Sequence, residues 1–381
     1  MDSMTNEIVP EVTDDHEAVV RRQRWALPLL TVSWLLLGTI LVASVIQIER
    51  WELAPGEAQR VAPRMEFEGS NGTAAPKRYP ARNQIRFVTA FGGQITALDS
   101  FVGWIDPHVN VDTYTQRFGE RTPSSERKIA FQAMFGAKQI AEYVAMRKLG
   151  YDARFIDGPI IVEDVVCEEG PSSTSACKVL QIGDRITAFN GTAVEHVADL
   201  APLMKGREAG TSVTLSVVPD GETKPVTRKV TLIVSPDDAT RVIIGFIPAD
   251  TRSVELPFEV SINTVDIGGP SAGLAFTLAL LDELSPGELL GETPVAATGT
   301  IDETGAVGAI GALTQKAIAV RDAGAKVFLV PAGQSVEEIA AAQKAAGSGV
   351  RIIPVATLDE ALEALEKLGG DALGAPTQSM N

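Results

Sequence analysis

The feature that most restricts how this chain can fold is an uncharged apolar run from Trp25 to Ile48. A bilayer span needs about 20 such residues. Arg21, Arg22 and Arg24 precede the run, and positive residues on that side predict a cytoplasmic N-terminus. We therefore predict a cytoplasmic tail at residues 1–20 and a single transmembrane helix at residues 25–48, with everything after it outside the cytoplasm. An uncleaved anchor in the cell membrane is favoured, and a signal peptide cleaved near residues 42–44 is the alternative.

Composition excludes several function classes. The net charge is −16 and no basic patch stands out, which argues against nucleic-acid binding. No motif has the spacing of a metal site, so we expect neither a metal nor another cofactor. The two cysteines, Cys167 and Cys177, could form one disulfide or stay as free thiols, and both interpretations remain open.

A candidate nucleophile lies in the segment from Gly268 to Gly273, which reads Gly-Gly-Pro-Ser-Ala-Gly. Ser271 follows a proline and opens an apolar run, so it is predicted to sit at the start of a helix. Unpaired N–H groups and the positive end of the helix dipole gather there, where they could hold an oxyanion.

The candidate base is a lysine, because the segment from Pro257 to Leu368 contains no histidine. Lys316 lies on a predicted helix at residues 312–323, and its neighbours three and four residues away are apolar. Burial disfavours the ammonium form, as a general base near neutral pH requires. Alternatively, Ser271 is only a turn residue and Lys316 extends to water. Their joint occurrence at this spacing favours a Ser-Lys pair.

These motifs carry a family resemblance. Gly-Pro-Ser-Ala-Gly around Ser271, the strand from Ala297 to Ile301 and the segment from Ile310 to Ala317 resemble the proteolytic domain of Lon-type proteases. The resemblance implies that Ser271 is the nucleophile, Lys316 the base and Thr298 a hydrogen-bonding partner of the lysine. Many Lon enzymes have Asp three residues before the serine, where this chain has Gly268. Lon domains commonly form rings, so the resemblance also implies a homo-oligomer.

A second module is predicted upstream. A strand at residues 160–166, another at 186–189, the turn signal Asn190-Gly191 and a later hairpin resemble a bacterial PDZ domain at residues 157–234. Such domains add a peptide as a strand to a sheet edge. The binding loop is expected at residues 156–160, which assigns Gly158 and Ile160 to peptide binding.

The remaining segments complete an α+β chain. Residues 51–156 are interpreted as an extracytoplasmic connector with a strand and a long helix from Pro123, residues 254–369 as the Lon-type α/β domain, and residues 370–381 as a flexible tail. The whole order resembles bacterial membrane-anchored PDZ-Lon proteins. The sequence contains no phosphate-binding loop, so the predicted function is an ATP-independent serine endopeptidase that acts on polypeptides. The PDZ-like module is expected to bind peptides or the C-termini of these substrates. The alternative is a surface-tethered peptide-binding adaptor whose protease domain is inactive.

Overall fold

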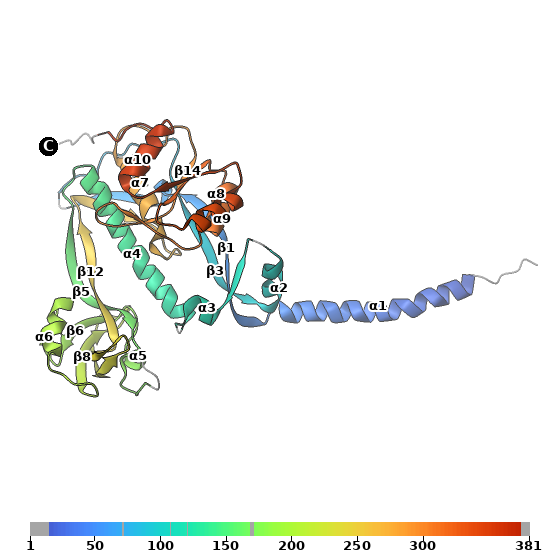
Figure 1. Cartoon of the computed structure of the whole chain (residues 1–381), viewed down its shortest axis with the longest axis horizontal. Coiled ribbons are helices and arrows are strands. Elements are labelled where there is room, and N and C mark those ends of the chain that lie inside the picture. The colour runs from blue at the N-terminus through green and yellow to red at the C-terminus, as the bar shows by residue number, and fades with distance from the viewer. Residues whose placement is uncertain (1–14, 71, 107, 120, 168–170, 375–381) are drawn as a thin grey trace, which may run out of the picture.

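A long apolar helix projects from the body of the protein (Figure 1). The structure is a computed structural model that describes residues 15–374 except 71, 107, 120 and 168–170, with side chains from residue 26. Helix α1 (Asp15–Ala43) contains the one stretch in this described part, Ala26–Ala43, that is long and apolar enough to cross a membrane, and its side chains are exposed. It ends before the predicted Ile48 because Gln47 already pairs with Thr96 in a sheet.

The two predicted tails are only partly described. Residues 1–14 and 375–381 lie outside the described part, and residues 15–20 belong to α1 instead of to a tail. Residues 370–374 do not fray, since Asp371 exchanges hydrogen bonds with Glu288 and Leu373 packs on the core.

A six-stranded sheet forms the centre of the larger module, in the order β18-β17-β14-β3-β1-β4. The first four strands run parallel, and β1 pairs antiparallel with both β3 and β4. The strands are β1 (Gln47–Arg60), β3 (Arg86–Thr96), β4 (Asn110–Thr113), β14 (Val295–Ala297), β17 (Val327–Pro331) and β18 (Arg351–Val355).

Helices cover both faces of this sheet. Successive strand residues point to opposite sides, so each face contributes apolar side chains to a different core. Val295, Val327 and Leu329 face a core shared with α7 and α10, whereas Ala296, Phe328 and Val330 face α8 and α9. Every residue of α7 is buried. The helices are α7 (Gly273–Leu284), α8 (Leu313–Asp322), α9 (Val336–Ala346) and α10 (Leu358–Lys367).

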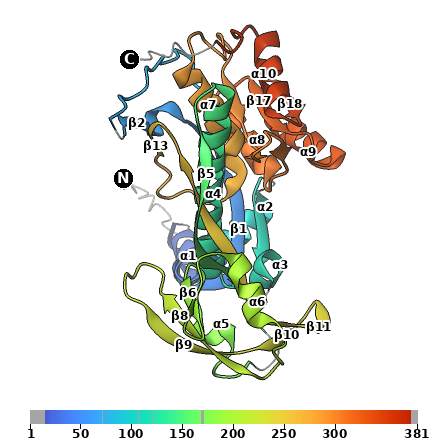
Figure 2. The same ribbon diagram turned by 90° about the vertical axis from the view of Figure 1, so that its left-hand side faces the viewer.

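The segment interpreted as a connector is part of this core. Its strands β1, β3 and β4 supply half of the sheet, and helix α4 (Pro123–Lys148) packs against α7. Helix α4 begins at the predicted Pro123, Thr122 caps it, and the same helix also contacts the second module (Figure 2). The sequence predicted a connector and not core strands because residues 51–96 are rich in Gly and Pro, which are uncommon inside strands. The remaining short helices here are η1 (Ala62–Arg64), α2 (Ala97–Ile105) and α3 (Tyr114–Phe118).

A second sheet, in the order β12-β5-β6-β8-β9 with β7 beside β6, encloses a separate apolar core. The turn at Asn190-Gly191 has the positive φ angles that the sequence signal requires. Its elements are β5 (Arg154–Val165), α5 (Ala176–Val179), β6 (Arg185–Phe189), β7 (Thr192–Ala193), η2 (Val197–Asp199), α6 (Leu200–Met204), β8 (Ser212–Val218), β9 (Val226–Thr231) and β12 (Phe246–Glu255). Two further strand pairs are β10 (Ile233–Ser235) with β11 (Asp238–Ile243), and β2 (Met65–Gly69) with β13 (Phe258–Ile262).

Candidate active site

Ser271 lies in a short helix, η3 (Pro270–Ala272), that leads directly into α7. The preceding residue, Gly269, has φ 88°, a conformation that favours glycine, and it turns the chain sharply into the helix. The carbonyl of Ser271 accepts hydrogen bonds from the Gly299 N–H at 2.8 Å and from the Thr298 hydroxyl at 3.0 Å. The serine is therefore fixed between a buried helix and the strand segment after β14.

Helix α4 holds the loop on its other side. The N–H of Gly269 donates to the Ala130 carbonyl at 2.7 Å. A Cβ atom built on Gly268 would stand 2.9 Å from the Ala130 Cβ. An aspartate at position 268, which many Lon enzymes have, would not fit this packing. The glycine is thus explained by the close approach of α4.

Lys316 reaches Ser271 from α8. Its Nζ lies 2.6 Å from Ser271 Oγ and donates to Thr298 Oγ1 at 3.3 Å. The helix begins at Leu313 and is followed by Gly324 with positive φ, close to the predicted range of residues 312–323. The three residues singled out from the sequence motifs, Ser271, Thr298 and Lys316, therefore meet at one point.

Burial changes the acid–base properties of the lysine. Lys316 is 4% exposed and Thr298 is fully buried. Desolvation by burial lowers the pKa of Lys316 from 10.5 to about 7. A neutral amine beside a serine hydroxyl can accept its proton, and this arrangement is suited to nucleophilic catalysis.

The other ionisable candidates lie elsewhere. Asp266, the nearest acid before the serine, is exposed, and within the described chain the Lys316 amine bonds to Ser271 and Thr298 and not to this carboxylate. His108 lies 3.1 Å from Asp106, and His196 lies 4.0 Å from Asp250, both far along the chain from the serine. The described residues contain no cluster of side chains that could hold a metal ion.

The predicted peptide-binding loop is a strand. Gly158 and Ile160 belong to β5, and Ile160 is fully buried between partners on β12 and β6. A strand that is paired on both sides cannot accept an added peptide, so Ile160 is not placed to bind one. Gly158 lies against Thr251 of β12, which occupies that side of β5. The edge on this side is β12, beside which η2 lies, with the Val197 N–H donating to Asp250 at 2.8 Å.

The pair Gly245-Phe246 marks the start of β12, the edge strand of the second sheet, and the sequence analysis did not use it. Gly245 has φ 99°, its carbonyl accepts the Val166 N–H, and Phe246 packs into the core of the second sheet. A glycine followed by a large apolar residue at a strand start marks the turn into the edge strand.

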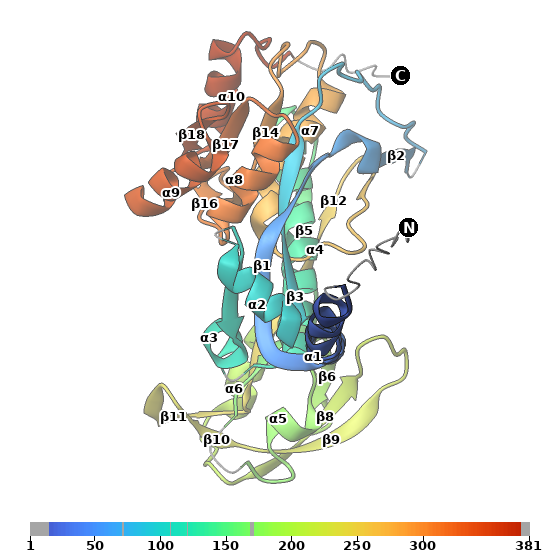
Figure 3. The ribbon, with the colours of Figure 1, turned by 90° about the vertical axis from the view of Figure 1, so that its right-hand side faces the viewer.

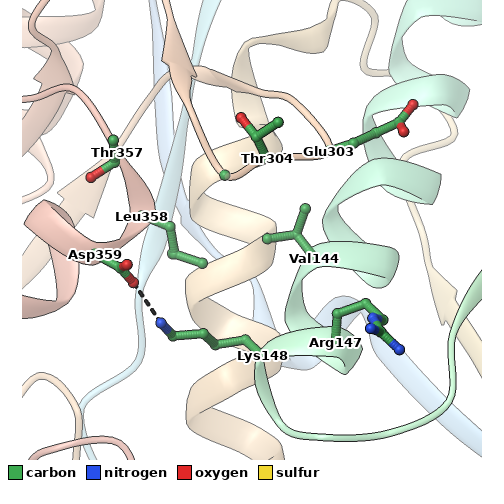
Figure 4. Close-up of a pocket in the computed structure, with 9 residues that line it drawn as sticks. Val144, Arg147, Lys148, Glu303, Thr304, Thr357, Leu358 and Asp359 are labelled. Atoms are coloured by element: carbon green, nitrogen blue, oxygen red, sulfur yellow. Dashed lines mark hydrogen bonds and ion pairs between the residues drawn. The ribbon is translucent and has the colours of Figure 1, made fainter.

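A separate cavity of about 380 Å³ lies between the end of α4, the start of α10 and the turn joining β15 (Thr300–Ile301) to β16 (Val307–Gly308) (Figure 4). Lys148 and Asp359 form an ion pair across it at 2.6 Å. Its lining includes neither Ser271 nor Lys316. The cavity is therefore distinct from the serine site.

Comparison with known proteins identifies both modules. Residues 254–367 match the Lon protease (S16) C-terminal proteolytic domain, and residues 145–230 match the PDZ domain. No curated protein matches the chain.

Two solved structures are similar to part of this chain. The PDZ domain of the SdrC-like protein from Listeria monocytogenes is 20% identical, with 24% of this chain and 87% of that chain covered and a TM-score of 0.20. A protein from Geobacillus thermodenitrificans known from a solution structure is 19% identical, with 22% of this chain and 92% of that chain covered and a TM-score of 0.18.

Replacing the buried lysine should stabilise the fold. In Lys316→Met the free energy of unfolding at pH 7 should rise by up to about 4 kcal/mol, because the unfolded lysine holds a proton that the buried one loses. The unfolded state binds the extra proton only below about pH 10.4, so the difference should shrink as the pH rises from 7 to 10. Urea unfolding at several pH values measures this. A Met variant that is less stable at pH 7 would contradict the burial cost.

Adding one methyl group at Gly268 should destabilise the serine loop. Gly268→Ala should lower the free energy of unfolding by about 1–3 kcal/mol, since the new Cβ meets α4. Gly311→Ala is the matched control, because a Cβ there meets nothing within 4 Å. Thermal unfolding of both variants measures the difference, and equal stabilities would refute the close packing.

Proposed function

We propose that this chain, which carries a PDZ domain and a Lon-type proteolytic domain, is a membrane-anchored serine endopeptidase that works without ATP. The observation that carries the proposal is the 2.6 Å separation of Lys316 Nζ and Ser271 Oγ, with the pKa of the lysine lowered to about 7. A serine needs a base that is neutral at working pH, and the buried amine meets that requirement.

In the proposed reaction, neutral Lys316 takes the proton of Ser271 as the serine oxygen attacks a peptide carbonyl. The negative charge forms on the carbonyl oxygen near the N–H groups of Ser271 and Ala272, at the start of the helices η3 and α7. Protonated Lys316 then gives its proton to the leaving amine, and the acyl-enzyme forms. Water, deprotonated by Lys316, attacks the ester, and Ser271 recovers its proton as the acid product leaves.

Thr298 is proposed to position the lysine. Its hydroxyl donates to the Ser271 carbonyl and accepts from Lys316, so one side chain fixes both partners. A lysine has a flexible stem, and a fixed acceptor keeps its Nζ on the serine.

Substrate delivery is assigned to β12. It is the terminal strand of the second sheet, and addition of a strand to a sheet edge is the mode in which PDZ domains take up extended peptides. The strand runs on through Glu255 into β13 and the serine loop, so a peptide held there lies on the element that leads to the active site. Extended or unfolded segments are the expected substrates.

Helix α1 is proposed to anchor the enzyme as a single span, with both modules on the outer side. The apolar stretch Ala26–Ala43 lies outside the body and covers no core. An exposed apolar helix of this length is expected to lie in lipid.

The proposal predicts nucleotide-free cleavage that depends on one hydroxyl. The purified full chain should cut an unfolded protein without ATP, and Ser271→Ala should lower the rate by about 10⁴- to 10⁶-fold. Ser261→Ala, an exposed serine on β13, is the control and should stay active. Peptide release measured by mass spectrometry gives the rate. A folded, peptide-binding wild type without cleavage would instead favour the adaptor.

Removing the Thr298 hydroxyl should slow the reaction without unfolding the site. Thr298→Val keeps the shape and leaves Lys316 with one fewer partner, which should lower kcat by about 10- to 100-fold. Thr298→Ser retains the hydroxyl and should recover most of the rate. Equal kcat values for the Val variant and the wild type would exclude a positioning role.

A further inference from the structure

Helix α2 carries an exposed apolar face that no part of the described chain covers. We define the α2 apolar face as Phe101, Val102, Trp104 and Ile105, and Trp104 is 81% exposed. Phe101 and Trp104 stack with ring centroids 6.4 Å apart. Four large apolar side chains gathered on one short helix mark an interaction surface.

The helix itself is firmly built. Thr96 and Asp99 form a reciprocal capping box at its N-terminus. Its opposite face packs on the sheet, where Gly103 is buried so closely that a Cβ atom would meet Val111 at 2.8 Å. The apolar face is therefore held in one orientation, away from the strands.

The same helix adjoins the end of α1. The N–H that opens α2, that of Ala97, donates to the Ile46 carbonyl at 3.0 Å, and Ile46 is three residues after the last residue of α1. Three residues span at most about 10 Å. The strands lie on one side of α2, and α1 leaves the body on the other (Figure 1). Seen from the side on which α1 departs, α2 lies next to α1 and across its direction (Figure 3).

We infer that the α2 apolar face inserts into the bilayer surface from which α1 emerges, so that α2 is a second, interfacial membrane contact. This inference rests on the proposed anchor. A short helix lying across the direction of the span runs in the plane of the membrane, and Trp and Phe favour that interface. The contact would hold the body upright on the membrane at two points instead of one.

The bilayer is favoured over a protein partner by continuity with α1, because the exposed residues Val45 and Ile46, which follow α1, extend its apolar surface toward α2. The charges nearby are acidic. Glu52, whose pKa is raised by burial and by Asp99 and Asp106, lies beside the helix. Insertion should therefore depend on apolar burial and occur in bilayers of neutral phosphatidylcholine, without anionic lipid.

The test uses tryptophan fluorescence of the full chain in phosphatidylcholine bilayers whose acyl chains carry bromine at a shallow or a deep position. The Trp104 signal is the difference between the wild type and Trp104→Phe. Trp34→Phe gives the signal of α1, and Trp51→Phe gives the signal of a residue packed against Phe118 in the body. The Trp104 signal should be quenched more by shallow than by deep bromine, the Trp34 signal more by deep, and the Trp51 signal by neither.

Each other result overturns the inference. Quenching of the Trp34 signal without quenching of the Trp104 signal would keep the anchor and remove the α2 contact. A Trp104 signal shielded from aqueous acrylamide but unquenched by bromine would assign the α2 apolar face to a second copy or a partner protein. No quenching of either signal would remove both the anchor and the interfacial helix.

Discussion

The proposed chemistry depends on burying one amine beside one hydroxyl. Lys316 is buried on α8, and desolvation alone lowers its pKa to about 7. That environment requires the central sheet, since Thr298 follows β14 and bonds to both Ser271 and Lys316. It also requires α7 and α4, which pack against the loop that carries the serine. A buried amine destabilises the fold, so the elements around it must be well packed, and the fully buried α7 meets that need.

The two modules are joined by shared elements. The long helix α4 packs on α7 and η3 at the serine and on β5 and β12 of the second sheet. Strand β12 begins at Phe246, which packs in the core of the second sheet, and ends at Glu255, inside the segment that matches the proteolytic domain. Its Arg252 pairs with Glu303 on the turn that follows the Thr298 segment. A peptide added to the edge of β12 would therefore touch an element that both modules use. Among the described elements, α1 has its main contact with the body at α2.

The sequence predicted the local features well. The motifs around Ser271, Thr298 and Lys316, the start of α4 at Pro123 and the Asn190-Gly191 turn each depend on residues close together in the chain, and the structure has them where expected. The errors concern long-range pairing. Strand β3 pairs with β14, which lies about 200 residues later in the chain, and β1 pairs with β3. No local pattern reveals such pairing, so the sequence of this segment predicts only a connector. The sequence around Gly158 and Ile160 is the same whether its strand lies at the edge of the sheet or inside it. Only the pairing of β12 with β5 shows that β12, and not β5, is the edge strand. Gly268 likewise needed the neighbouring Ala130 to be explained.

The most direct test of the central claim is the pH dependence of Ser271 phosphonylation by a small phosphonofluoridate probe, followed on the full chain by mass spectrometry. Phosphonylation of the free enzyme, in which the serine oxygen displaces fluoride from phosphorus, reports the ionisation of its base. The rate should rise with pH and level off above a midpoint near 7, because only the neutral form of Lys316 accepts the serine proton. A midpoint near the pKa of an ordinary lysine, or labelling that survives in Lys316→Met with an unchanged profile, would contradict the account.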